Sequence, residues 1–166
     1  MAGRDYVTRM GSLHDFTKGG VQIISGDPRH YAFSNIFEVA RSSMPWEAVA
    51  VAKNMEYVLE VVRAEGQSGW RSSRHDQTAL VMDGTATVHL VKPADEVSGS
   101  PSGSFALPGE PPGQTMGRVT ASRGHLVLLP ARAAYQITSE HPAVLLVQTK
   151  RGPDTIERWA EICQSA

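Results

Sequence analysis

The sequence predicts an all-β fold, a barrel of short strands with a long loop and a C-terminal α-helix. Short apolar runs bounded by Gly, Pro or Asp recur along the chain, as in residues 78–84 and 124–130, and this pattern is typical of barrels and sandwiches. Residues 92–117 are dense in Gly, Pro and Ser and predict the loop. Only residues 154–163 combine a capping pattern with apolar residues at helical spacing.

The length and charge of the chain limit its class. With 166 residues and a net charge of −1, we expect one barrel domain over residues 21–166, preceded by a mobile or partner-ordered arm at residues 1–20. The near-zero charge disfavours nucleic-acid and membrane partners. One cysteine and the lack of a signal-like or membrane-spanning run indicate a cytoplasmic protein.

The strands are expected in short apolar segments separated by turn residues. Residues 54–63 fit a helix or a strand, and their β-branched content favours a strand. Asp83-Gly84 predicts a hairpin turn. At the C-terminus, Asp154 is the expected N-cap, with Glu157 completing a capping box. The strands are predicted at residues 21–24, 36–40, 54–63, 78–82, 85–91, 118–122, 124–129, 134–137 and 144–149.

The connector at residues 29–35 is rich in aromatic and hydrogen-bonding side chains, which protein interfaces favour. We therefore expect a partner interface formed by Arg29, His30, Tyr31, Phe33 and Asn35. Carboxylates such as Glu56 and Glu60 are interpreted as solvated strand residues rather than an acid/base pair.

The order of these elements resembles that of cupins. The first cupin motif is G-x5-H-x-H-x3,4-E-x6-G, and the second is G-x5-P-x-G-x2-H-x3-N. Their three histidines and one glutamate bind a divalent metal inside the barrel. With the first motif ending at Gly84, Trp70 and Ser72 occupy the histidine positions and Gln77 the glutamate position. The second motif, placed on Gly124 and Pro130, has Arg132 at its glycine position and Tyr135 at its histidine position.

None of these four ligand positions carries a good metal ligand, so the sequence predicts no metal in this chain. An alternative placement that begins at Gly69 makes His75 the first histidine of the motif. It leaves Gln77 as the second ligand and provides no carboxylate at the required spacing, whereas a metal site needs three or four convergent ligands.

Within the cupins, the chain resembles the small (alpha) subunit of two-component hydroquinone 1,2-dioxygenases. The resemblance implies a jelly-roll barrel in a complex that opens the ring of hydroquinones with Fe(II) and O2, as in 4-nitrophenol degradation. It also implies a large (beta) partner subunit that carries the iron, in an α2β2 heterotetramer. The residues that carry it are FTKGGVQIISGDPRHYAFSNIFEVA (16–40), VAKNMEYVLEVVRAEG (51–66), HDQTALVMDG (75–84), RGHLVLLPARAAY (123–135) and ERWAEIC (157–163).

Three hypotheses follow. The first is a non-catalytic subunit that stabilises the iron-bearing subunit and contributes to its pocket. The second is a stand-alone, metal-free cupin that binds a small aromatic ligand in a barrel pocket lined by Trp70, Gln77 and Tyr135. The third is an enzyme with an unusual metal set around His75.

Overall fold

The computed structural model describes residues 11–17 and 35–162. Within these ranges the chain forms ten strands, preceded by one short helix and followed by another, in agreement with the all-β prediction. The helices are α1 (Ile36–Ser42) and α2 (Trp159–Ile162). The strands are β1 (Ala48–Asn54), β2 (Tyr57–Gln67), β3 (Arg71–Ser73), β4 (Gln77–Asp83), β5 (Thr85–Pro93), β6 (Ser104–Ala106), β7 (Gly113–Ser122), β8 (Leu126–Leu129), β9 (Ala134–Lys150) and β10 (Thr155–Ile156).

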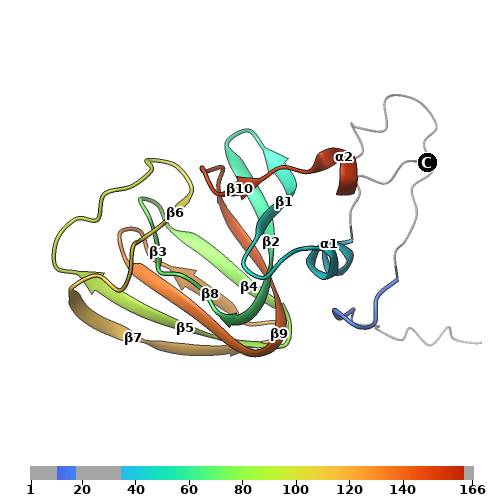
Figure 1. Ribbon diagram of the computed structural model, residues 1–166, viewed down its shortest axis with the longest axis horizontal. Helices are drawn as coiled ribbons and strands as arrows, with labels where there is room; N and C mark the ends of the chain where they lie inside the picture. The colour runs from blue at the N-terminus through green and yellow to red at the C-terminus, as the bar shows by residue number, and fades with distance from the viewer. Residues whose placement is uncertain (1–10, 18–34, 163–166) are drawn as a thin grey trace, which may run out of the picture.

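The long strand β9 belongs to both layers of the barrel and joins them (Figure 1). Its C-terminal half lies between β2 and β4, and its N-terminal half pairs with β3 and β5. Strands β1, β10 and β8 extend the first layer, and β6 and β7 extend the second. The sequence predicted two strands here, at residues 134–137 and 144–149, and the structure joins them into one.

The turn at Asp83 and Gly84 is a corner and not the predicted hairpin. Strand β4 pairs with β8 and β9, whereas β5 pairs with β7 and β9, so the two strands do not pair with each other. Both run along the same edge of β9, and a bulge near Asp83 separates them. Gly84 therefore turns the chain from β4 in the first layer into β5 in the second.

The predicted loop at residues 92–117 is shorter than expected. Strand β5 continues through Pro93, and β7 begins at Gly113. Between them, β6 pairs with β3, and its Phe105 is buried. The sequence did not predict this strand, because Phe105 is one of few large apolar residues among many Gly, Pro and Ser.

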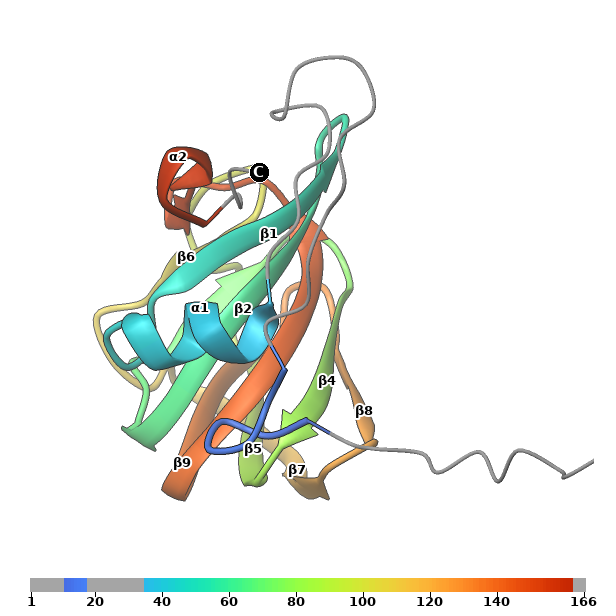
Figure 2. The same ribbon diagram turned by 90° about the vertical axis from the view of Figure 1, so that its right-hand side faces the viewer.

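Residues 36–40, predicted as a strand, form the helix α1, which lies across the outer face of the sheet (Figure 2). Asn35 caps the helix because its side chain accepts a hydrogen bond from the Phe37 N–H, 3.0 Å away. Glu38 lies in the first turn and Arg41 in the last, which suits the helix dipole. The N-cap residue and the charges at the two ends of this segment indicate a helix, but its apolar content led to the strand prediction.

The segment 11–17, part of the region predicted as a mobile or partner-ordered arm over residues 1–20, packs against α1. Leu13 is buried with Phe37 and Val39, and its N–H donates to the Asp83 carboxylate at 2.8 Å. The Phe16 ring stacks on Phe37. Residues 1–10 and the predicted strand at 21–24 lie outside the described residues.

The C-terminal helix begins later than predicted. Thr155 and Ile156 form β10, which pairs in parallel with β1. Asp154 bonds to Arg71 rather than capping a helix, and α2 begins at Trp159. Cys163 lies outside the described residues. No helix in the described part of the chain is long and apolar enough to span a lipid bilayer.

Candidate functional site

A hydrogen-bonded cluster inside the barrel joins two of the four motif positions. The Tyr135 hydroxyl donates to Oε1 of Gln77 at 3.1 Å, and Nε2 of Gln77 donates to the Thr149 hydroxyl at 2.6 Å. All three residues are buried, and burial raises the pKa of Tyr135 above its usual value. The polar atoms of Gln77 therefore bond to protein groups, as buried polar atoms must.

Trp70 and Ser72 lie on the face of β3 opposite this cluster. Trp70 packs with Val91 and Ala134, and Ser72 is fully buried and donates to the Ala133 carbonyl at 2.9 Å. Arg71, between them, stands opposite Tyr135 in the strand register and lines the barrel cavity. Adjacent residues of a strand point to opposite faces. Arg71 therefore faces the barrel interior, whereas the motif spacing predicted this position for its two neighbours, Trp70 and Ser72.

Arg132 occupies the glycine position of the second motif, and its backbone keeps the conformation that favours glycine. Its φ is 64°, in the left-handed region that costs an L-residue about 1 kcal/mol. Its N–H donates to the Ser73 carbonyl at 2.7 Å, which fixes the turn. The turn thus has the geometry that glycine would suit, although the sequence carries an arginine.

His75 has both ring nitrogens engaged. The Lys150 N–H donates to Nε2 at 3.1 Å, so this nitrogen carries a lone pair and the ring proton lies on Nδ1, beside the Ser73 hydroxyl at 3.0 Å. Partial burial and the Lys150 charge lower the pKa of His75 and favour this neutral form. The imidazole is a fixed part of the strand packing.

The residues at the motif positions do not fit a metal ion such as iron. Gln77, Tyr135 and Ser72 are neutral, and their side chains bond to other groups of this chain. Within residues 11–17 and 35–162, no group of three or more His, Cys, Asp or Glu side chains could hold a metal ion.

A cavity of about 70 Å³ lies inside the barrel beside this cluster. The polar part of its wall is formed by Glu60, Ser68, Arg71, Ser104 and Tyr135, and the remaining wall is largely apolar. Arg71 donates to the Ser104 hydroxyl at 2.9 Å and to Asp154 at 2.7 Å. A cavity with convergent polar groups is the best candidate for a binding site in a protein of this kind.

Glu60 is buried inside the barrel, which corrects the sequence interpretation of a solvated carboxylate. It is only 4% exposed, and the Thr155 hydroxyl donates to its Oε1 at 2.5 Å. Desolvation raises the pKa of Glu60 to about 7, against the opposing effects of Thr155 and Arg71. Glu60 alternates with Val58 and Val62 on one face of β2, and this pattern in the sequence could have indicated that its side chain is buried. Glu56, in contrast, is exposed as predicted.

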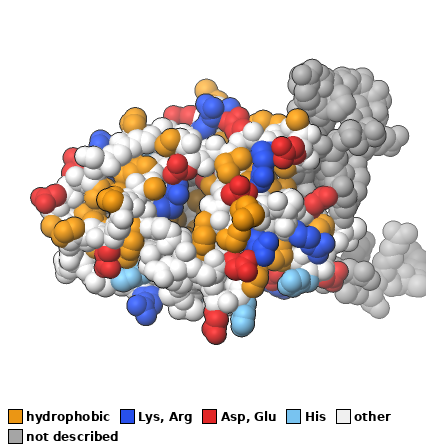
Figure 3. Space-filling view, viewed as in Figure 1, with side chains coloured by type: hydrophobic (Ala, Val, Ile, Leu, Met, Phe, Trp, Pro, Cys, Tyr) orange, Lys and Arg blue, Asp and Glu red, His pale blue; other side chains and the backbone are white. Residues whose placement is uncertain are grey.

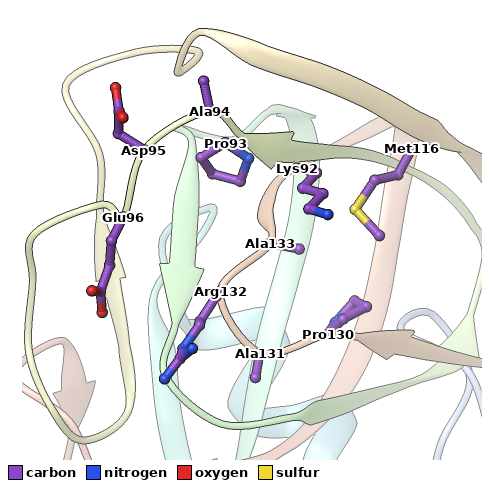
Figure 4. A pocket seen from close by; sticks show the side chains of 10 residues that line it. All are labelled: Lys92, Pro93, Ala94, Asp95, Glu96, Met116, Pro130, Ala131, Arg132 and Ala133. Atoms are coloured by element: carbon purple, nitrogen blue, oxygen red, sulfur yellow. The ribbon is translucent and has the colours of Figure 1, made fainter.

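A second hollow, of about 530 Å³, opens on the surface between the end of β5, strand β7 and the turn that precedes β9 (Figure 4). Lys92 and Met116 lie on one side of it, and Asp95 and Glu96 on the other. Glu96 lies 3.5 Å from Arg74, with which it forms an exposed ion pair. Mixed charges and shallow apolar contacts give this hollow no defined ligand chemistry.

The predicted partner interface falls mostly outside the described residues. Arg29, His30, Tyr31 and Phe33 are among the residues that the structure does not describe. Asn35 is described, and it caps α1 and donates to the Thr17 carbonyl at 2.7 Å. A role for this segment in partner binding stays a prediction.

Two solved structures are similar to this chain over nearly its whole length. One is hydroquinone 1,2-dioxygenase PnpCD in complex with Cd²⁺ and 4-hydroxybenzonitrile, with 46% identity, a TM-score of 0.92 and coverage of 99% of this chain and 100% of that chain. The other is hydroquinone 1,2-dioxygenase from Sphingomonas sp. TTNP3 with 4-hydroxybenzoate bound, with 49% identity, a TM-score of 0.91 and coverage of 97% and 99%. No family model and no curated protein matches the chain.

A more distant match is a longer chain in the structure of PnpCD with Fe³⁺. It is 13% identical, with a TM-score of 0.62, and the match covers 90% of this chain but 42% of that chain. This likeness shows the fold alone. Because one PnpCD chain is matched in full and another only in part, PnpCD contains two chains of different length that share this architecture.

These matches confirm the cupin barrel and the resemblance seen in the sequence. Identity of 46% and 49% over almost the full length is far above what a shared fold alone would require. The chain belongs to the family of small, cupin-like subunits of two-component hydroquinone 1,2-dioxygenases.

Proposed function

We propose that this chain is the non-catalytic subunit of an Fe(II)-dependent hydroquinone 1,2-dioxygenase. In this proposal it stabilises a large, iron-bearing subunit, contributes to the pocket of that subunit, and assembles with it as an α2β2 heterotetramer in the cytoplasm. The observation that carries the proposal is the full-length similarity to chains of two such dioxygenases. The buried bonds among Gln77, Tyr135 and Thr149 support it, because they give these side chains a structural role.

Ring cleavage is expected to require both chains. The chain should be expressed alone and together with a large subunit, each preparation supplied with Fe(II) and O2. We expect co-purification and hydroquinone cleavage only from the pair, because the described residues of this chain offer no set of metal ligands. Comparable turnover by this chain alone would overturn the proposal.

The edge strand β8 offers a surface for that assembly. Its sequence, Leu-Val-Leu-Leu, contains no charge, and Leu126 and Leu128 are 68% and 55% exposed. Within the described residues, β8 pairs only with β4. Proteins usually protect an open strand edge with charges or proline, so an apolar edge of this kind marks an interaction surface. Over the face shown in Figure 3, by comparison, acidic and basic side chains are interspersed with hydrophobic ones.

Replacing both exposed leucines of β8 with serine should weaken binding of the large subunit. We expect the Leu126→Ser/Leu128→Ser variant to bind at least about tenfold more weakly, since two buried apolar contacts would be lost. Titration of labelled large subunit measures the affinity. Met55, 88% exposed on the β1–β2 hairpin, provides the control Met55→Ser. Unchanged affinity of the double variant would show that this edge lies outside the interface.

The alternative of a stand-alone barrel that binds an aromatic ligand has less support from the structure. The cavity of about 70 Å³ is roughly half the 150 Å³ of a cavity known to hold benzene. Trp70, one of the three residues expected to line the pocket, packs with Val91 and Ala134 instead.

A further inference from the structure

The barrel cavity brings together a cationic group, a hydroxyl and a carboxyl group from three different strands. Arg71 on β3 and Ser104 on β6 bond to each other, and Glu60 on β2 lines the same space. The Ser104 oxygen accepts from Arg71, and the Ser104 hydroxyl also lies within hydrogen-bonding reach of Tyr135. The Arg71 side chain is 24% exposed, and therefore the polar wall reaches solvent.

The size of the cavity restricts its occupant. Its volume of about 70 Å³ is roughly half the 150 Å³ of a cavity known to hold benzene. An aromatic ring exceeds this space, whereas formate or acetate has a comparable size. The largely apolar remainder of the wall, which includes Val62, Leu129 and Leu145, suits a ligand with one charged end.

We propose that this cavity is a binding site for a small monocarboxylate, of formate or acetate size, held by Arg71, Ser104 and Glu60. The guanidinium and the serine hydroxyl donate to the ligand carboxylate, and Glu60 donates to it when protonated. Charge-assisted hydrogen bonds of this kind are about twice as strong as those between neutral groups. Of the four motif positions, Tyr135 lines this cavity, whereas Trp70, Ser72 and Gln77 do not.

Protonation of Glu60 should control the affinity. Two carboxylates that share a small site cannot both ionise, so the ligand carboxylate binds the form of the protein in which Glu60 is protonated. The charged groups around Glu60 are Arg71 on β3 and Asp154 next to β10, with the ionisable Tyr135 on β9. Because the pKa of Glu60 is raised to about 7, the protonated fraction falls about tenfold between pH 6 and pH 8.

Calorimetric titration of the full-length chain with sodium formate and sodium acetate tests the site. We expect saturable binding that is about tenfold tighter at pH 6 than at pH 8, and no binding of benzoate, which is too large. Sodium chloride at equal ionic strength serves as the control for a general anion effect. Absence of saturable binding at pH 6, or equal binding of benzoate, would overturn the proposal.

Two variants assign the roles of the side chains. Glu60→Gln keeps a hydrogen-bond donor that does not titrate, so it should bind formate with little change between pH 6 and pH 8. Arg71→Gln should lose binding, provided that circular dichroism and thermal unfolding show it folded. If Arg71→Gln does not fold, Ser104→Ala replaces it, with an expected loss of about fivefold. A pH dependence that persists in Glu60→Gln would overturn the role of Glu60.

Discussion

Replacing Glu60 with glutamine is expected to stabilise the protein at pH 8 by about 3 kcal/mol and to leave its stability at pH 4 nearly unchanged. The carboxyl group is buried, and desolvation raises its pKa to about 7 from an ordinary value of 4.5. The folded state therefore binds the proton more tightly than the unfolded state. The Glu60 contribution to stability is fully present below pH 4.5 and is lost as the pH rises through 7.

Glutamine retains the acceptor for the Thr155 hydroxyl and does not ionise, so the variant should show a flatter profile of stability against pH. Urea unfolding at several pH values between 4 and 8 gives the free energy of unfolding of each protein. Glu110→Gln is the matched control because Glu110 is exposed. A stability difference that stays constant from pH 4 to pH 8 would contradict the buried, titrating carboxyl group.

Apolar runs bounded by turn residues predicted β2, β4, β5, β7, β8 and both ends of β9, whereas β1, β3, β6 and β10 were not predicted. What local pattern could not show is which strands pair. Asp83-Gly84 has the composition of a hairpin turn, yet β4 and β5 both pair with β9, which is distant in sequence. At residues 36–40, the apolar content favoured a strand, while the cap at Asn35 and the packing against Leu13 produced a helix. Tertiary contacts therefore decided both cases.

The candidate site was only partly predictable for a related reason. Motif spacing identified Gln77 and Tyr135, which the structure joins by a hydrogen bond. The same spacing selected Trp70 and Ser72, although the residue between them, Arg71, lines the cavity. A shift of one position along a strand reverses the face, and spacing alone does not resolve it. Glu60 was overlooked because both faces of β2 are covered: Val61 packs under α1 while Glu60 faces the barrel.

Replacing Gly84 with alanine should destabilise the barrel by about 3 kcal/mol, because the corner between β4 and β5 has no room for a side chain. A Cβ atom there would lie 2.8 Å from the Ala143 Cβ and 3.1 Å from the Pro142 carbonyl oxygen. The backbone φ of 75° is also one that an L-residue adopts at a cost. Both neighbours belong to β9, the strand that pairs in both layers, so relieving this clash would require a shift of β9.

Gly66 separates these two effects because it has nearly the same backbone angle with open space around it. Its φ is 72°, and nothing lies within 4 Å of a Cβ built on it. Gly66→Ala should therefore cost about 1 kcal/mol, the conformational part alone. The excess loss in Gly84→Ala, measured by urea unfolding of both variants, gives the steric part. Equal losses would mean that β9 shifts at Ala143 to accommodate the added methyl group. Glycine at position 84 would then be required by the backbone angle and not by close packing.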